Sequence, residues 1–391
     1  MRARDLDAID TSALFTPFML AGVTLPNRFV MPGMQRGLCV EGAPSQSMTD
    51  YYRRRVAGGV GLVITESVAV DHESATQNGR FARLIERTAP AWAACFSAIK
   101  AEGGHIISQL WHEGGLRPEG GDGPYARYPT LSPSGWANAT RQNGRAASME
   151  ELDAIKAGFV RSARIAQQAG ADGVEVHGAH GYLLDQFLWT ATNRRADGYG
   201  GPAIADRVRF PAEIVAAIRA ACGPGFLISF RFSQWKESDY SARVAESPDE
   251  LEVMLSMLRR AGADLIHAST RRFWLPEWPE SPLGLAGWCK AVGGMPVATV
   301  GSVGLNVDIM ESFSGKPVEG RIREGLRELT GRFAGGEFDL VSVGRSLISD
   351  PQWVEKVRRG AYDAIRTFER ADTKLPDAEI AALARARDPS R

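Results

Sequence analysis

The 391-residue sequence predicts a single-domain α/β protein, a closed (β/α)₈ TIM barrel. Short apolar or β-branched runs recur eight times along the chain, several of them flanked by glycine. Amphipathic stretches with helical spacing separate these runs. No low-complexity segment or interdomain linker interrupts the alternation. These features favour a closed barrel over an open doubly wound sheet, which is the structural alternative.

The eight predicted strands are short and apolar throughout, as is typical of parallel strands buried on both faces. They are residues 27–33, 61–66, 105–110, 172–177, 226–231, 264–269, 296–300 and 338–343.

The clearest predicted helix is 149–169, whose apolar residues share one face. Ser148 can cap it, because Glu151 follows three residues later as in a capping box. Similar patterns cover residues 203–221, 248–261 and 351–359. The prediction is one domain over 1–391, with a helical excursion near 312–336 and a helical tail at 361–391.

Charge and cysteine usage exclude several classes of protein. The 46 basic and 46 acidic residues are interspersed, without the basic stripe of a nucleic-acid-binding protein or a polybasic membrane patch. The four cysteines form no CxxC pair, which argues against a zinc ribbon or an iron–sulfur cluster. No apolar run reaches the length of a membrane span or of a signal peptide. We therefore expect a cytoplasmic protein with no nucleic-acid partner, no membrane partner and no metal.

Polar residues fall repeatedly at the predicted strand ends, where TIM barrels carry their chemistry. Glycine-rich turns follow the seventh and eighth strands at Gly301-Ser302 and Gly344-Arg345. Exposed backbone N–H groups there, with the Arg345 guanidinium, predict a phosphate site. The alternative is that both glycines only permit tight turns.

A second cluster of hydrogen-bond donors follows the fourth strand. His177, His180 and Tyr182 lie within one glycine-containing turn, where they could stabilise an oxyanion and deliver a proton. The HxxH spacing also fits a zinc site, and the histidines could simply be hydrogen-bonded at the rim.

Two further strand-end residues suit a heterocyclic ligand. The Gln109 amide can pair with an imide-like edge, because it offers a donor and an acceptor together. Arg231 would be an unpaired buried charge unless a ligand meets it, or unless it pairs with Glu66 or Glu175.

At this point the chain resembles the Old Yellow Enzyme family of FMN-dependent ene-reductases. The resemblance rests on LPNRFVMPGM at the first strand, SQLWHEGG at the third, HGAHGYLLDQFLWTATNRRADGYGG after the fourth and DLVSVGRSLISDPQW at the eighth. It extends from about Leu14 to Gly360.

The resemblance implies that FMN is the cofactor and that NAD(P)H is the reductant. It implies that Gln109 binds the pyrimidine edge of the flavin, that Arg231 lies near its N1 and O2 atoms, and that Ser67 approaches its O4 and N5 side. The implied cofactor-binding set is Pro32, Gly33, Met34, Gln35, Ser67, Gln109, Arg231, Gly301, Ser302, Gly344 and Arg345. Gln35 replaces the Thr or Cys usual in this family, Ser67 stands where alanine is common, and Gly115 stands where arginine is expected.

The implied reaction passes hydride from NAD(P)H through flavin N5 to the β-carbon of an α,β-unsaturated carbonyl compound. His177 and His180 would bind the carbonyl oxygen, and Tyr182 would protonate the α-carbon. Trp274, in the loop after the sixth strand, could form a substrate wall or could only pack the loop. Rival functions are an FMN-dependent dehydrogenase of amines or saturated carbonyl compounds and a non-catalytic flavin-binding protein. A homo-oligomer is compatible with the sequence, which does not distinguish NADH from NADPH.

Overall fold

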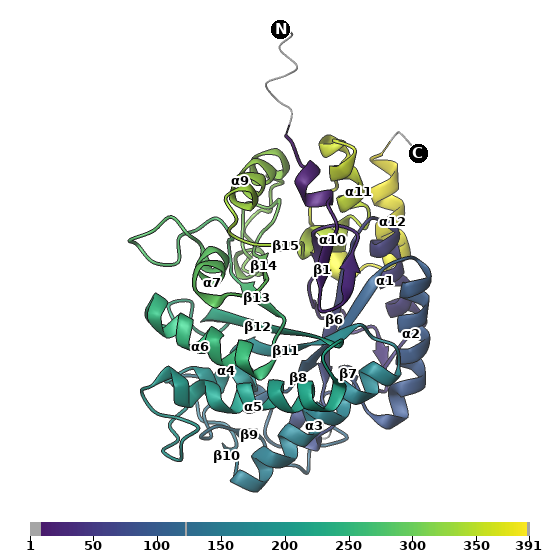
Figure 1. Ribbon diagram of the computed structural model, residues 1–391. Helices are drawn as coiled ribbons and strands as arrows, with labels where there is room; N and C mark the ends of the chain where they lie inside the picture. The colour runs from purple at the N-terminus through teal and green to yellow at the C-terminus, as the bar shows by residue number, and fades with distance from the viewer. Residues whose placement is uncertain (1–8, 122, 389–391) are drawn as a thin grey trace.

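The computed structural model describes residues 9–121 and 123–388. Eight parallel strands lie at the centre of the molecule, surrounded by helices (Figure 1). They form a closed barrel, because β3 pairs with β15 on one side and with β6 on the other. In order around the barrel the strands are β3 (Phe29–Met31), β6 (Leu62–Ala69), β8 (His105–Trp111), β11 (Gly173–His180), β12 (Leu227–Lys236), β13 (Leu265–Ser269), β14 (Val297–Val300) and β15 (Leu340–Ser342). The (β/α)₈ prediction is confirmed, and each predicted strand overlaps one of these strands.

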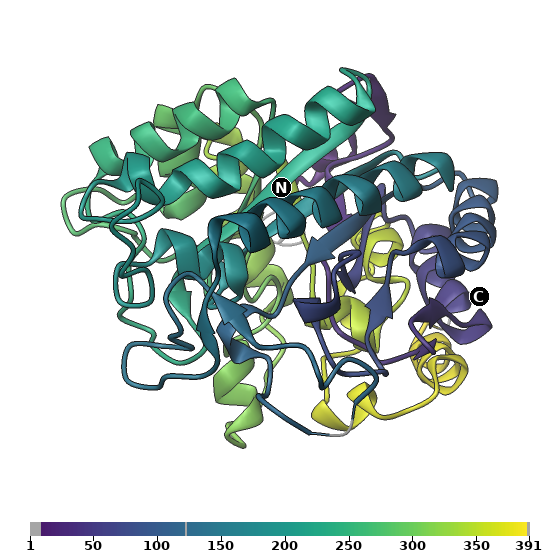
Figure 2. The same ribbon diagram turned by 90° about the horizontal axis from the view of Figure 1, so that it is seen from below.

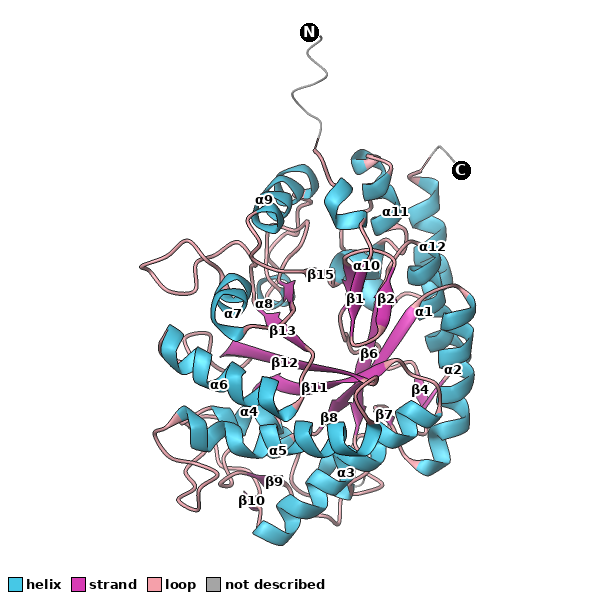
Figure 3. Ribbon diagram, viewed as in Figure 1, coloured by secondary structure: helices cyan, strands magenta, loops and turns pink. Residues whose placement is uncertain are grey.

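A helix follows each barrel strand and covers its outer face (Figure 3). These helices are α1 (Gln46–Ala57), α2 (Ala89–Ala101), α3 (Met149–Gln168), α5 (Ile204–Cys222), α6 (Pro248–Ala261), α7 (Leu285–Gly293), α9 (Ile322–Ala334) and α11 (Trp353–Arg358). Figure 2 shows α3, α5 and α6 side by side along one flank.

Additional short helices and strands lie outside the eight strand–helix units of the barrel. The additional helices are α4 (Leu183–Leu188), α8 (Ile309–Phe313), α10 (Arg345–Ser349), α12 (Asp377–Ala386) and the 3₁₀ turns η1 (Ser12–Phe15), η2 (Glu73–Ala75), η3 (Glu86–Thr88), η4 (Gly114–Leu116), η5 (Tyr362–Ala364) and η6 (Arg370–Thr373). The additional strands are β1 (Phe18–Leu20), β2 (Val23–Leu25), β4 (Cys39–Val40), β5 (Ala43–Pro44), β7 (Ala82–Arg83), β9 (Leu131–Ser132) and β10 (Arg145–Ala146). None of the helices in the described ranges is both long and apolar enough to cross a membrane.

Helix α3 begins where the sequence predicts. The Ser148 hydroxyl accepts a hydrogen bond from the Glu151 backbone N–H at 3.2 Å, and the Glu151 carboxylate accepts one from the Ser148 N–H at 2.9 Å. These two bonds satisfy N–H groups that the helix itself leaves without partners. The predicted capping box is therefore confirmed.

The segment 312–336 is mostly α9, the crossover helix between β14 and β15. The tail contains η5, η6 and α12, and it docks on the barrel through buried charges. Asp377 at the start of α12 pairs with Arg54 and Arg55 of α1. The Lys356 ammonium donates to the Ala384 carbonyl at 3.0 Å.

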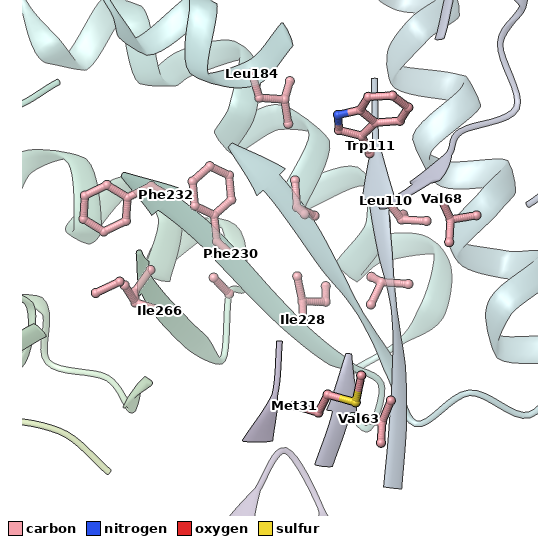
Figure 4. Close-up of a cluster of buried hydrophobic side chains, with 14 of the residues drawn as sticks. Met31, Val63, Val68, Leu110, Trp111, Leu184, Ile228, Phe230, Phe232 and Ile266 are labelled. Atoms are coloured by element: carbon pink, nitrogen blue, oxygen red, sulfur yellow. The ribbon is translucent and has the colours of Figure 1, made fainter. Parts of the chain in front are cut away.

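Side chains of the barrel strands alternate between two apolar clusters. One face belongs to a cluster that also contains residues of the surrounding helices, and Figure 4 shows Val63, Ile228 and Phe230 among its side chains. The opposite face forms a second cluster that includes Leu62 and Leu227 and is joined by Leu20 and Leu25 of the β1–β2 hairpin. Because side chains alternate along a strand, the inward residues that follow this second cluster are the polar ones of the site.

Candidate active site

A cavity of about 350 Å³ opens at the C-terminal ends of β3, β12, β13, β14 and β15. The predicted site residues that line it are Pro32, Gly33, Met34, Gln35, His180, Arg231, Gly301, Ser302, Gly344 and Arg345. This is the rim where TIM-barrel enzymes bind their ligands. Five other predicted residues, Ser67, Gln109, His177, Tyr182 and Trp274, do not line this cavity.

One end of the cavity is built around the Arg345 guanidinium. Its Nη2 donates to the Ser302 hydroxyl at 2.9 Å and to the Val307 carbonyl at 2.6 Å, and its Nη1 donates to the Asp308 carbonyl at 3.0 Å. Burial lowers the pKa of Arg345 to about 10, so the group stays cationic at neutral pH. The Ser342 hydroxyl on the same wall is buried and has no hydrogen-bond partner among the described residues. A guanidinium that is fixed by its neighbours at a cavity wall suits a phosphate.

The backbone at this end is held in conformations that keep it close to the cavity. Ser302 has a φ of +51°, in the left-handed region that residues other than glycine rarely occupy. A Cβ added at Gly301 would lie 2.5 Å from the Thr270 hydroxyl and 2.8 Å from the Thr270 carbonyl. Only glycine fits at Gly301, so the turn after β14 is specified by sterics.

An oriented amide, that of Gln109, lies behind the cavity wall at Gly33. Gln109 donates from Nε2 to Glu175 at 2.8 Å and accepts from the Ser67 hydroxyl at 2.7 Å. Gly33 lies directly against this amide, because a Cβ there would sit 2.7 Å from the Gln109 Nε2 and from the Thr65 carbonyl. Gln109 and Ser67 are thus placed together immediately behind Gly33, which lines the cavity.

Arg231 projects into the same region with weak protein contacts. Its Nη1 lies 3.4 Å from the Gly33 carbonyl, its Nη2 lies 3.3 Å from the Ser269 hydroxyl, and its Nε is buried without a partner. Within the described residues it forms no salt bridge with Glu66 or Glu175, the two alternatives that the sequence leaves open. An incompletely satisfied buried guanidinium at a cavity wall fits an electron-rich ligand edge.

His177, His180 and Tyr182 form one cluster beside the cavity. The His177 ring centroid lies 5.3 Å from that of His180 and 5.4 Å from that of Tyr182. His180 lines the cavity, and its Nε2 lies 2.8 Å from the Ser269 hydroxyl. Both ring nitrogens of His177 are buried without partners in the described part of the chain. No group of three or more His, Cys, Asp or Glu side chains that could hold a metal occurs in residues 9–121 and 123–388.

Burial sets the protonation states of this cluster. Burial, with a smaller effect from Arg231, lowers the pKa of His177 to about 3 and the pKa of His180 well below its usual value. Burial raises the pKa of Tyr182. At neutral pH the two imidazoles are therefore uncharged, and the phenol keeps its proton.

A buried ion pair supports the turn that carries His180, whose φ is +65°. The Asp185 carboxylate accepts from the Gly181 N–H at 2.6 Å and from the Lys236 ammonium at 2.8 Å. Lys236 also donates to the Ser233 carbonyl at 3.1 Å. Removing one member of such a pair would leave an uncompensated buried charge, so both Asp185 and Lys236 are needed for this arrangement of the turn.

For Trp274 the sequence leaves open a substrate wall or loop packing, and the contacts of its side chain favour loop packing. Trp274 is not on the cavity wall, because its ring packs against Phe273 at 5.2 Å and lies 5.3 Å from the Arg321 guanidinium. The wall is formed instead by Trp235, whose ring centroid is 4.9 Å from that of His180 and whose Nε1 donates to the Ser269 carbonyl at 3.1 Å. The sequence does contain a signal for Trp235. Side chains alternate along a strand, so a strand that continues past Arg231 places Ser233 and Trp235 on the same face as Arg231.

The cavity groups together fit FMN. Arg345 and Ser302 suit its phosphate, whereas Arg231, with the Gln109 amide behind Gly33, suits a polar heterocycle at the other end. The fold and this donor set define a flavin-binding TIM barrel.

Comparisons with known proteins agree with this class. The family described as NADH:flavin oxidoreductase / NADH oxidase matches residues 13–314. NADH oxidase of Thermoanaerobacter brockii is 33% identical over 364 residues, covering 90% of this chain and 52% of the relative. 12-Oxophytodienoate reductase 7 of Oryza sativa subsp. japonica is 30% identical over 383 residues, covering 93% of this chain and 92% of the relative. The structure of morphinone reductase in complex with tetrahydroNAD aligns with a TM-score of 0.76 at 25% identity, covering 92% of this chain and 94% of that one.

The chain belongs to the NADH:flavin oxidoreductase / NADH oxidase family, and the resemblance to Old Yellow Enzyme is confirmed. Membership of this family supports FMN as the cofactor. The chain spans about half the length of the first curated relatives that it matches, 52% of the NADH oxidase and 50% of a metal reductase from Desulforamulus reducens.

Proposed function

We propose that this protein is an ene-reductase that reduces the C=C bond of α,β-unsaturated carbonyl compounds at the expense of NAD(P)H. The observation that carries the proposal is the cluster of two uncharged imidazoles and a protonated phenol beside the cavity. The relatives named 12-oxophytodienoate reductase and morphinone reductase support it.

The cofactor would lie along the cavity between Arg345 and Gln109, with Pro32, Met34 and Gln35 along one wall. Ser302 and the backbone at Gly301 and Gly344 would complete the phosphate end. Bound FMN would supply hydride transfer between the reduced nicotinamide and the substrate carbon.

His177 and His180 would bind the carbonyl oxygen of the substrate. A neutral imidazole donates one N–H without placing a full charge in the site, and His177 has no competing partner among the described residues. Donors fixed in a buried site stabilise negative charge as it develops on the oxygen. Ser269 bridges His180 and Arg231, so the same hydroxyl orients groups on both sides of the cavity.

Tyr182 would supply the proton to the α-carbon. Its raised pKa keeps the phenol protonated throughout the neutral range, which is the state that a proton donor requires. Trp111 packs edge-on against it at 5.2 Å and fixes the ring.

The second candidate is an FMN-dependent dehydrogenase of amines or saturated carbonyl compounds on the same barrel. Oxidation of that kind needs a general base at the substrate, whereas the lowered pKa of His177 makes it a weak base and the raised pKa of Tyr182 keeps the phenol protonated. A non-catalytic flavin-binding protein would leave the buried cluster of His177, His180 and Tyr182 without a role.

We further propose a cytoplasmic location, a small-molecule partner and assembly into a homo-oligomer, all from the sequence.

The test is an anaerobic visible spectrum of the FMN-loaded protein. Reduction with NADPH or NADH bleaches the flavin bands, and 2-cyclohexenone is then added. Rapid return of the oxidised bands would support the ene-reductase. Bleaching without return, also with acyclic enones, would contradict it and favour the dehydrogenase. Failure to retain flavin would contradict both.

A further inference from the structure

A fully buried carboxylate, that of Glu175, lies beneath the cofactor cavity, and among the described residues it forms no salt bridge with a lysine or an arginine. Glu175 is on β11, and its side chain points into the barrel in register with Gln109 on β8 and Ser229 on β12. It is one inward position before His177, so it belongs to the layer directly below the site. A buried carboxylate is costly unless its lone pairs are used.

The carboxylate is hydrogen-bonded on both oxygens. Its Oε1 accepts from Gln109 Nε2 at 2.8 Å. Its Oε2 accepts from the Ser229 hydroxyl at 2.9 Å and lies 2.8 Å from His267 Nδ1. Burial alone would raise the pKa of Glu175, but His267, Arg231 and Gln109 outweigh this and lower it to about 2. At neutral pH Glu175 is therefore ionised and can only accept.

This acceptor-only character decides which way the Gln109 amide faces. The NH₂ group must point at Glu175, so the carbonyl oxygen must point at the Ser67 hydroxyl, which donates to it at 2.7 Å. One amide N–H and one carbonyl lone pair remain. The amide nitrogen and carbon lie directly behind Gly33, which lines the cavity. A flipped amide would place its oxygen against the carboxylate and would present the opposite pattern to a ligand.

We propose that Glu175 is a positioning residue for cofactor binding: it fixes the donor–acceptor direction of the Gln109 amide that meets the cofactor. The inference rests on the proposed contact between Gln109 and FMN. Glu175 is fully buried and does not line the cavity, so it would act through its hydrogen bond with Gln109. His267 and Ser229 in turn hold the carboxylate in place from β13 and β12.

The variant Glu175→Gln changes the hydrogen-bonding pattern of this side chain while keeping its size. If the new side chain keeps its carbonyl oxygen toward Ser229 and His267, its NH₂ group faces the NH₂ group of Gln109. Two donors then oppose each other, and the Gln109 amide is driven to flip. A flipped Gln109 amide would no longer match the donors and acceptors of the flavin edge, so we expect FMN binding to weaken about tenfold or more.

A double-mutant cycle tests whether the effect passes through Gln109. FMN dissociation constants are measured by fluorescence quenching for wild type, Glu175→Gln, Gln109→Met and the double variant, with thermal unfolding of each. The proposal expects Glu175→Gln to weaken binding about tenfold in the wild-type background and less than about threefold in the Gln109→Met background. Equal losses in both backgrounds would overturn it, because Glu175 would then act independently of Gln109.

Two further variants control for folding and for charge. Glu175→Asp keeps an acceptor-only group and is expected to bind FMN at least about threefold more tightly than Glu175→Gln. Equal affinities of these two variants would overturn the proposal, and this comparison also decides the case if the double variant does not fold. Glu252→Gln, on the exposed face of α6, is the matched control. Failure of the wild-type protein to bind FMN would instead contradict the proposed function.

Discussion

Arg345 and Ser302 join the ends of two neighbouring barrel strands, with the guanidinium donating to the hydroxyl over 2.9 Å. The other partners of Arg345 are the carbonyls of Val307 and Asp308. All of these acceptors are uncharged, so they fix the position of the cation without cancelling its charge. The positive potential at this end of the cavity therefore remains available to a phosphate.

Replacing Arg345 should weaken FMN binding. Charge-assisted hydrogen bonds contribute about 1.5–3 kcal/mol, so Arg345→Met should raise the FMN dissociation constant about 10- to 100-fold. Arg345→Lys should lie between this variant and wild type, because an ammonium cannot reproduce the fixed fork. Fluorescence titration measures the constants, with Arg358→Met, a change at a half-exposed arginine of α11, as control. An unchanged constant in Arg345→Met would remove Arg345 from the phosphate site.

Gly33→Ala should damage the heterocycle end of the cavity. The added Cβ would lie 2.7 Å from both the Gln109 amide nitrogen and the Thr65 carbonyl, so the amide must move. We expect a loss of unfolding free energy of about 1–3 kcal/mol together with weaker FMN retention. Gly225→Ala, where no atom lies within 4 Å of the new Cβ, is the matched control. Normal FMN retention in Gly33→Ala would show that the amide is not held against the cofactor.

Tyr182→Phe should separate the two half-reactions. We expect oxidation of the reduced enzyme by 2-cyclohexenone to slow about 10²- to 10⁴-fold, while reduction by NAD(P)H stays nearly intact. Stopped-flow absorbance follows both steps. Tyr199→Phe, whose hydroxyl contacts Glu213 outside the cavity, is the control. Equal losses in both half-reactions would reject Tyr182 as the proton donor.

Acid should destabilise the protein through its buried neutral histidines. The pKa of His177 is lowered from 6.5 to about 3 in the folded state, so between these values the unfolded chain binds a proton that the folded chain does not. The stability that this group contributes is therefore complete above pH 6.5 and falls as the pH drops. His177→Asn should reduce the dependence of the unfolding free energy on pH, measured by urea unfolding of FMN-saturated protein at about pH 5 and about pH 7. His105→Asn is the control. If His177→Asn leaves the pH dependence of the unfolding free energy unchanged, His177 is not held neutral in the folded protein.

Much of the fold was readable from local patterns. In a parallel barrel every strand ends at the same rim, so finding Arg231, Gly301 and Gly344 at strand ends was enough to bring them together. The sequence pattern did not predict where each strand ends. The apolar run that predicts β12 ends at Arg231, yet the strand extends to Lys236 and places Trp235 on the cavity wall.

The layer beneath the site was also beyond the reach of local patterns. Glu175 contacts His267 although β12 lies between their strands, and this contact depends on the stagger of the closed barrel. A lone glutamate in an apolar run gives no sign of such a partner. Likewise, the sequence left the partner of Arg231 open, because pairing with Glu66 or Glu175 depends on side-chain geometry.

The alternation of β11 limits how this protein can change over evolutionary time. Glu175 and His177 face inward, whereas Val174 and Val176 belong to the cluster that packs on the helices. Inserting or deleting a single residue in this strand would exchange the two faces, placing valines at the cavity and charges among the helices. A change in length is therefore better tolerated in the loops than in this part of β11. Substitution of a single inward side chain alters the cavity without disturbing the alternation.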